Sequence, residues 1–191
     1  MMPARALALA AVVLLAAAAA PASALVACRT TRGEVVLRLF ANDVPASVAH
    51  FVALVRRREP DGRGFYDGTR FHRVVGDFLV QGGDPVTRGG SCEDAGQGAG
   101  PAGIPVEANP RHGFWRGAVG FARGGALENG SQFFVLVSAR PELGEQDFTC
   151  FGHVASGMEV VDRLETCDEL LEARVLEPRP PAAEGADGGD R

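Results

Sequence analysis

Three polar side chains able to hydrogen-bond a peptide lie within two largely apolar stretches of the 191-residue sequence. Residues 71–84 read FHRVVGDFLVQGGD and carry Arg73 and Gln81, and residues 129–134 read NGSQFF and carry Gln132. Apolar and polar residues alternate in both stretches in the manner of β-strands. A guanidinium and two amides around an apolar pocket can hold a peptide, and none of the three is a nucleophile that could cut it.

These two stretches, in this order, resemble the signature of the cyclophilin-type peptidyl-prolyl cis-trans isomerases. The likeness extends with gaps from about Val26 to about Leu176. It implies a mainly β fold, a closed eight-stranded antiparallel β-barrel capped by two α-helices. It also implies an isomerase that accelerates rotation about Xaa-Pro bonds and needs no cofactor and no metal. Its partners would be unfolded or partly folded polypeptides containing Xaa-Pro, and we expect a monomer.

The resemblance assigns roles to the matching positions. Arg73 is the expected catalytic residue, because a fixed guanidinium can donate to the prolyl nitrogen when the amide twists. Gln81 would hold the substrate backbone and help to orient Arg73, and Gln132 would bind the substrate backbone. The other expected substrate-binding residues line the proline slot or offer a strand edge to the peptide: Phe78, Leu79, Ala122, Arg123, Phe134, Leu143 and Phe148.

Three of the matching positions depart from common family residues. Glu142 stands where the best-known eukaryotic members have tryptophan, and Phe148 where they have histidine. A carboxylate at the first position removes a large apolar contact and an indole donor, so we expect weak cyclosporin binding. Arg123 replaces a common asparagine at the strand edge, where binding is mainly by main chain.

Two other classes of function compete with catalysis of isomerisation. A non-catalytic module that binds proline-containing segments would be favoured by loss of Arg73 or of the pocket phenylalanines, and neither is lost. A hydrolase using Ser131 lacks a nucleophile-elbow pattern and an assigned histidine. His50, His112 and His153 show no ligand spacing, so we interpret them as structural.

The start of the chain has the features of an export signal. Arg5 precedes an apolar run over residues 6–20, and small residues follow it. The run is shorter than the roughly 20 residues that span a bilayer. We predict a cleaved signal peptide at 1–24, one domain at 25–177 and a disordered tail at 178–191, with a periplasmic or secreted location.

Four cysteines allow three disulfide pairings, and the spacing leaves the pairing open. Cys28 and Cys150 lie in apolar strands, where they could simply be buried. A lipid on Cys28 is a minority alternative, because residues 26–32 resemble the first strand of the fold and leave no linker. A net charge of −5 without a basic face argues against nucleic-acid binding.

The hydrophobic pattern also locates the main elements. We expect a helix from about Pro45 to Arg56 with Asp43 as a possible cap, and a second helix from Met158 to about Glu165. Residues 83–103 are glycine-rich and are expected to form a long surface loop. Strands are predicted at 26–30, 34–39, 69–74, 78–82, 117–122, 133–137, 151–154 and 173–176.

Overall fold

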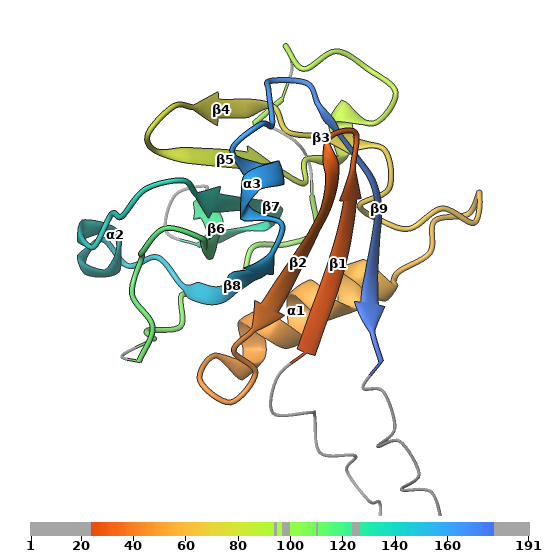
Figure 1. The fold of residues 1–191 in the computed structure, drawn as a ribbon. Helices are drawn as coiled ribbons and strands as arrows, with labels where there is room; N and C mark the ends of the chain where they lie inside the picture. The colour runs from red at the N-terminus through yellow and green to blue at the C-terminus, as the bar shows by residue number, and fades with distance from the viewer. Residues whose placement is uncertain (1–23, 94, 97–99, 110, 124–126, 178–191) are drawn as a thin grey trace, which may run out of the picture.

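The computed structural model describes residues 24–93, 95–96, 100–109, 111–123 and 127–177. Apart from Ala24, the predicted signal peptide lies outside these residues, and so does the predicted tail. The elements are β1 (Ala24–Thr30), β2 (Gly33–Leu39), α1 (Pro45–Arg56), β3 (Thr69–Arg70), β4 (Arg73–Val75), β5 (Leu79–Gly82), the 3₁₀ turn η1 (Pro85–Thr87), β6 (Ala118–Arg123), β7 (Glu128–Leu136), α2 (Glu142–Glu145), β8 (Cys150–Ser156), α3 (Met158–Val161) and β9 (Glu169–Leu176) (Figure 1).

The described strands form one antiparallel sheet in the order β3-β9-β1-β2-β8-β6-β7-β5-β4. Its two edge strands, β3 and β4, are separated in the chain only by Phe71 and His72. Because two residues carry the chain from one edge to the other, the sheet must curl until its edges meet. Phe71 lies at this seam and continues the pairing of β3 with the β9 side: its N–H donates to the Asp168 carbonyl and its carbonyl accepts from the Cys167 N–H, both at 2.9 Å. The two edges meet in a bridge between Arg70 and Asp84.

The mainly β class predicted from the sequence is confirmed, and its details differ. The described residues form nine strands instead of eight, because the predicted strand 69–74 is divided by the seam into β3 and β4. They also form three α-helices instead of two, since α2 carries no periodic signal in its four residues. The α3 helix ends at Val161, short of the predicted Glu165.

Helix α1 has the predicted bounds, with a different cap. Pro45 stands at its first position, where its fixed φ and missing N–H suit a helix start. The predicted cap Asp43 is wrong: its carboxylate lies 2.9 Å from Arg111 Nη1. The carboxylate of Glu107 accepts instead from Ala46 N at 3.2 Å and Ser47 N at 2.6 Å.

The main core lies between α1 and the inner face of the sheet. Phe51 of α1 is 1% exposed, and its ring centroid lies 5.1 Å from that of Phe151 and 5.5 Å from that of Phe133. A second apolar cluster packs on the other side of β7. It contains Leu79, Phe114, Ala118, Phe134, Leu136, Leu143 and Cys150, with Phe40, Phe78 and Phe148 partly buried against it. This second cluster contains the residues expected to hold proline.

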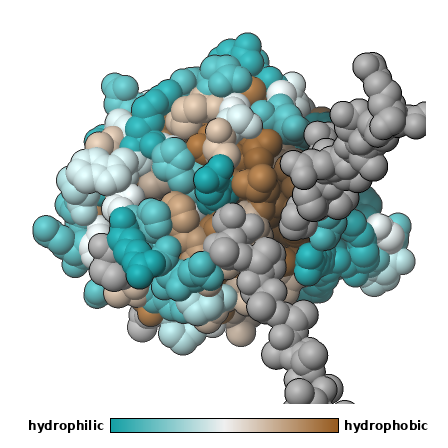
Figure 2. Space-filling view, turned by 60° about the horizontal axis from the view of Figure 1, so that its bottom comes forward, coloured by the Kyte–Doolittle hydropathy of each residue, from teal (hydrophilic) through white to brown (hydrophobic). Residues whose placement is uncertain are grey.

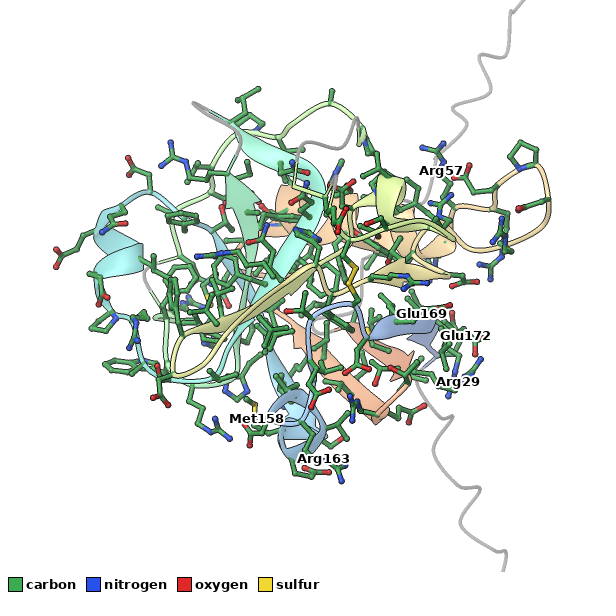
Figure 3. The ribbon with its side chains drawn as sticks, turned by 90° about the horizontal axis from the view of Figure 1, so that it is seen from above. Arg29, Arg57, Met158, Arg163, Glu169 and Glu172 are labelled. Carbon is green, nitrogen blue, oxygen red and sulfur yellow. A yellow bond between two sulfur atoms is a disulfide. The ribbon has the colours of Figure 1, made fainter. Side chains whose placement is uncertain are left out.

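The described ends of the domain lie side by side. Leu25 of β1 pairs with Leu176 of β9, and Figure 1 shows β1 beginning and β9 ending at the bottom of the molecule. Further along the same pair, the Arg29 guanidinium lies 3.4 Å from the Glu172 carboxylate (Figure 3). The face turned forward in Figure 2 carries mostly hydrophilic residues around a smaller apolar area. Among the described residues, no helix has the length and apolar character needed to cross a membrane.

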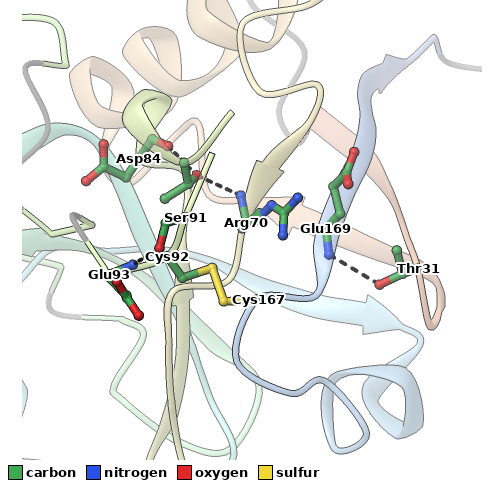
Figure 4. Close-up of a disulfide and its surroundings, with 9 residues drawn as sticks. Thr31, Arg70, Asp84, Ser91, Cys92, Glu93, Cys167 and Glu169 are labelled. Atoms are coloured by element: carbon green, nitrogen blue, oxygen red, sulfur yellow. Dashed lines mark hydrogen bonds between the residues drawn. A yellow bond between two sulfur atoms is a disulfide. The ribbon is translucent and has the colours of Figure 1, made fainter. Parts of the chain in front are cut away.

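The structure resolves the cysteine pairing that the sequence left open. Cys92 is bonded to Cys167 across 75 residues (Figure 4), and this bond ties the long loop after β5 to the segment before β9. Cys28 and Cys150 are free thiols, 4% and 2% exposed. The interpretation of these two as small buried side chains is therefore confirmed.

Candidate active site

Arg73 is the first residue of β4 and stands directly after the seam of the sheet. Its register partner in β5 is Gln81, and Arg73 Nη1 donates to Gln81 Oε1 at 3.5 Å. The guanidinium carbon lies 5.6 Å from the ring centroid of Phe78, within the range of a cation–π contact. Arg73 is exposed. The guanidinium thus contacts Gln81 and Phe78 and remains exposed to solvent.

Gln81 and Gln132 continue a line of hydrogen bonds inward from Arg73. Gln81 Nε2 donates to Gln132 Oε1 at 3.0 Å, and Gln132 Nε2 donates to Asp84 Oδ2 at 3.0 Å. The three polar residues predicted from the sequence are therefore brought together. Asp84 ends the line, and sequence reasoning assigned it no role. The sequence offered one signal for Asp84, which is an acidic residue directly after an apolar strand and two glycines.

His72 supports Gln81 from the seam. Its Nε2 lies 3.4 Å from Gln81 Nε2, and burial lowers the pKa of the imidazole, a shift that the nearby Asp84 carboxylate opposes. The neutral ring can accept the second amide hydrogen of Gln81, whereas a protonated ring could not. This contact gives His72 a place in orienting the Gln81 amide.

Gly83, the second of the two glycines before Asp84, stands at a position that requires glycine. Its φ is 83°, in the left-handed region, and a Cβ there would stand 2.8 Å from the Ser131 carbonyl oxygen. A side chain would also lie 3.0 Å from carbon atoms of the Phe133 and Tyr66 rings. Only glycine lets the end of β5 approach β7 this closely, and this approach places Asp84 beside Gln132.

The expected proline slot is an apolar surface next to Arg73. Leu79, Phe134 and Leu143 are buried, at 4%, 2% and 8% exposure. Phe78 and Phe148 are half-buried at its margin. Phe133 packs into the main core on the opposite face, as strand alternation predicts.

Phe114 belongs to the same slot and was missed in the sequence. Its ring centroid lies 6.0 Å from that of Phe134 and 6.5 Å from that of Phe148. Phe134 and Phe148 in turn meet edge to face, with centroids 6.0 Å apart and planes at 79°. A cavity of about 390 Å³ opens behind Phe114 and Phe148, and its lining does not include Arg73. The aromatic position just before β6 was the only sequence signal for Phe114.

The expected strand edge lies at the end of β6. Pairing of β6 with β8 covers Ala118 to Gly120 and stops before Ala122. The next residue, Arg123, places its guanidinium carbon 5.6 Å from the centroid of Phe148 and donates from Nη1 to the Gln146 carbonyl at 2.7 Å. Arg123 therefore borders the slot at Phe148, whereas Arg73 borders it at Phe78, and Ala122 precedes Arg123 in the strand.

A second arginine, also missed, stands beside Phe78. The guanidinium carbon of Arg140 lies 5.2 Å from the ring centroid of Phe78, so arginines flank this ring twice. Arg140 Nε lies 4.0 Å from the Glu142 carboxylate on α2. Nothing in the local sequence marks Arg140, because its partner Phe78 is distant in the chain.

The other histidines and Ser131 have partners or surroundings of a structural kind among the described residues. His50 Nε2 lies 2.5 Å from the Gly130 carbonyl and His153 Nε2 lies 3.0 Å from the Arg116 carbonyl, both structural contacts. His112 Nε2 lies 3.2 Å from Asp43. Ser131 Oγ is buried and makes no hydrogen bond within the described residues, so no base is in place to activate it. The described residues contain no cluster of His, Cys, Asp and Glu suited to a metal ion.

Known proteins match this chain over most of its length. The family model "Cyclophilin type peptidyl-prolyl cis-trans isomerase/CLD" matches residues 25–180. The chain is 36% identical over 143 residues to "Peptidyl-prolyl cis-trans isomerase-like 1" of Gibberella zeae, covering 71% of this chain and 77% of that protein. It is 33% identical over 153 residues to a peptidyl-prolyl cis-trans isomerase of Helicobacter pylori, covering 78% of this chain and 83% of the relative.

A solved structure shares the fold. A crystal structure of a cyclophilin type peptidyl-prolyl cis-trans isomerase from Cryptosporidium parvum superposes with a TM-score of 0.68 at 24% identity, covering 82% of this chain and 99% of that chain. The family match over nearly the whole domain and the relatives above 30% identity decide the assignment. The chain belongs to the cyclophilin-type peptidyl-prolyl cis-trans isomerases, EC 5.2.1.8.

Proposed function

We propose that the protein accelerates rotation about Xaa-Pro bonds of exported polypeptides during folding, and that Arg73 stabilises the twisted amide without a covalent step. Rotation breaks amide resonance and costs about 18–20 kcal/mol in the unaided reaction. In the twisted state the prolyl nitrogen becomes a hydrogen-bond acceptor. A donor placed for that state lowers the barrier more than it stabilises either planar isomer.

One observation carries this proposal. A guanidinium, held by Gln81 and Phe78, stands at the margin of an apolar slot that ends in buried Phe134. The slot suits the apolar proline ring, and Arg73 suits the polar nitrogen of the same residue. Arginine remains charged throughout the accessible pH range, so the donor needs no proton transfer.

The strand edge supports a substrate held by its main chain. β6 is released from β8 beyond Gly120, and Ala122 follows in an extended strand. A peptide backbone added along this edge would place its proline toward Phe134. We expect Arg123 and Gln132 to border the same peptide.

We also propose an exported location. An apolar leader precedes the domain in the sequence, and the Cys92–Cys167 bond suits an oxidising compartment. Cys28 is 4% exposed within β1 and pairs with Val35 and Ala173. This burial favours a soluble exported form over a lipid on Cys28. Mass spectrometry of the mature N-terminus tests both: Leu25 supports the proposal, and a lipidated Cys28 contradicts it.

The deciding experiment for catalysis is an exchange-NMR or protease-coupled assay of an Xaa-Pro peptide. We expect Arg73→Ala to lower kcat/KM by about 10²–10³-fold, the usual effect of removing a donor to the transition state. Arg73→Lys should restore only part of this, because an ammonium lacks the planar fork. Arg29→Ala, which removes a surface arginine paired with Glu172, is the control and should match the wild type.

The same assay tests the alternative of a non-catalytic binding module. A folded wild-type protein that binds the peptide without accelerating exchange would favour that module. Cyclosporin serves as a second ligand. Glu142, the chain neighbour of the slot residue Leu143, should keep the affinity of the protein for cyclosporin weak. Glu142→Trp should strengthen it, because the substitution restores an apolar contact and an indole donor.

A further inference from the structure

Asp84 is a fully buried carboxylate beside the active site. Its exposure is 0%, and N–H groups approach both of its oxygens. Oδ1 accepts from Val86 N at 3.1 Å, and Oδ2 accepts from Gly96 N at 2.8 Å and from Gln132 Nε2 at 3.0 Å. A buried carboxylate is costly unless hydrogen bonds compensate for lost hydration, and three donors from the described part of the chain converge on this one.

The chemistry of this carboxylate decides how both glutamine amides are turned. An ionised carboxylate only accepts, so Gln132 must present its NH₂ to Asp84. Gln132 Oε1 then faces Gln81. Because this oxygen only accepts, Gln81 must donate to it from its own NH₂. Gln81 Oε1 is therefore directed at Arg73, and a guanidinium only donates.

The line thus has one polarity, set by an acceptor at its buried end and a donor at its exposed end. Either amide turned by 180° would bring two acceptors or two donors together. Without Asp84, Gln132 could adopt both orientations, and Gln81 would follow it. In one of these orientations an NH₂ group faces the guanidinium and no longer holds it.

We propose that Asp84 is a positioning residue for the isomerase, acting through Gln132 and Gln81 to hold the Arg73 guanidinium in its donating position. This inference rests on the proposed role of Arg73. Asp84 does not touch the substrate. Its effect is to restrict the rotamers of an exposed arginine before the substrate arrives, which is the condition for a preorganised donor.

The test is a double-mutant cycle between Asp84→Asn and Gln81→Met, read as kcat/KM for an Xaa-Pro peptide. Asp84→Asn should lower kcat/KM about ten- to a hundredfold, as expected for small misplacement of a reacting group. In the Gln81→Met background the line is already cut between Gln132 and Arg73. Asp84→Asn should then change kcat/KM by less than about twofold, because coupled residues are not additive.

A merely structural role for Asp84 predicts a different cycle. The loss would then be equal in both backgrounds, and that result would overturn the proposal. Thr87→Val is the matched control: Thr87 Oγ donates to the Asp84 carbonyl at 2.6 Å and accepts from Arg70 N at 2.9 Å. It disturbs the same turn without touching the carboxylate, so it should lower thermal stability and leave kcat/KM within about twofold.

Asp84→Ser keeps the experiment decisive if Asp84→Asn does not fold. Serine is a good cap for the amide of Val86 at the start of η1, and it is too short to reach Gln132. The same cycle should give the same coupling. If Arg73→Ala retains full activity, the proposed role of Arg73 itself fails. If Arg73→Ala abolishes activity while the Asp84 losses are additive, only the positioning role fails.

Discussion

Glu128 is a buried carboxyl group on β7 whose ionisation opposes folding. It is 1% exposed; Oε1 accepts from Thr149 N at 2.7 Å, and the buried Oε2 has no hydrogen-bond partner among the described residues. Burial raises its pKa to about 7, Thr149 and Arg123 oppose the shift, and Glu107 adds to it. The folded state therefore binds this proton more tightly than the unfolded chain, in which the pKa is about 4.3.

The consequence is a stability that falls as pH rises. The contribution of Glu128 is fully present below about pH 4.3 and is lost as pH passes through about 7, where the carboxyl ionises. Glu128→Gln should raise the melting temperature more at pH 8 than at pH 5, because the folded carboxyl is still protonated at pH 5. Thermal unfolding between pH 5 and 9 measures this. The exposed Glu159→Gln should show no such difference, and equal gains at pH 5 and pH 8 would argue against a titrating Glu128.

At the scale of single residues, the sequence predicted those site residues whose side-chain type suits their expected role. Arg73, Gln81 and Gln132 meet as expected, because each belongs to a motif that specifies both its strand and the direction of its side chain. Asp84 is part of the same motif and was passed over. An aspartate after two glycines is typical of an exposed turn, and only the tertiary packing against β7 shows that it is buried at 0%.

At the scale of an element, helix α1 also has one feature that the sequence predicts and one that it does not. Its bounds follow from local signals, a proline at the first position and an apolar face of Val48, Phe51 and Val55. Its cap does not, because the group that binds the first amides is Glu107, about sixty residues away in the chain. Sequence spacing can propose Asp43, which is adjacent, but cannot reveal a partner brought in by the fold.

This capping arrangement predicts that loss of Glu107 destabilises the protein more than loss of Asp43. Glu107→Ala should lower the free energy of unfolding by about 1–2 kcal/mol, because it leaves the amides of Ala46 and Ser47 unpaired and removes a negative charge from the positive end of the helix dipole. Asp43→Ala should cost less, about 1 kcal/mol or below, since its partner Arg111 is largely exposed and His112 partly so. Urea unfolding of both variants measures the difference, and a larger loss for Asp43→Ala would restore Asp43 as the cap.

At the scale of the whole molecule, the active site lies where the curled sheet closes. The predicted barrel strand 69–74 could not be divided from the sequence, because Phe71 continues the apolar alternation that defines a strand. Its hydrogen bonds go to Cys167 and Asp168, on the β9 side of the seam. Arg73 follows two residues later, so the geometry that joins the two edges of the sheet also sets the start of the catalytic strand.

The disulfide reinforces the closure of the sheet. Its loss is the change expected to lower the stability of the fold most. Cys167 N donates to the Phe71 carbonyl at the seam, and Cys92 precedes Gly96, whose amide binds Asp84. A bond that spans 75 residues should stabilise the fold by about 4 kcal/mol through the entropy of the unfolded chain. Urea unfolding with and without reductant measures this, and Cys92→Ala/Cys167→Ala should unfold like the reduced wild type and no longer respond to reductant.

Thiol labelling identifies which pair is responsible. Cys28 and Cys150 are buried, and burial raises the pKa of each thiol to about 12, so neither should react in the folded protein. Mild reduction without unfolding should therefore add two labels, at Cys92 and Cys167, and unfolding should add two more. Labels on Cys28 or Cys150 after mild reduction would mean a different pairing, and an unchanged urea midpoint would mean that the sheet closes without help from the bond.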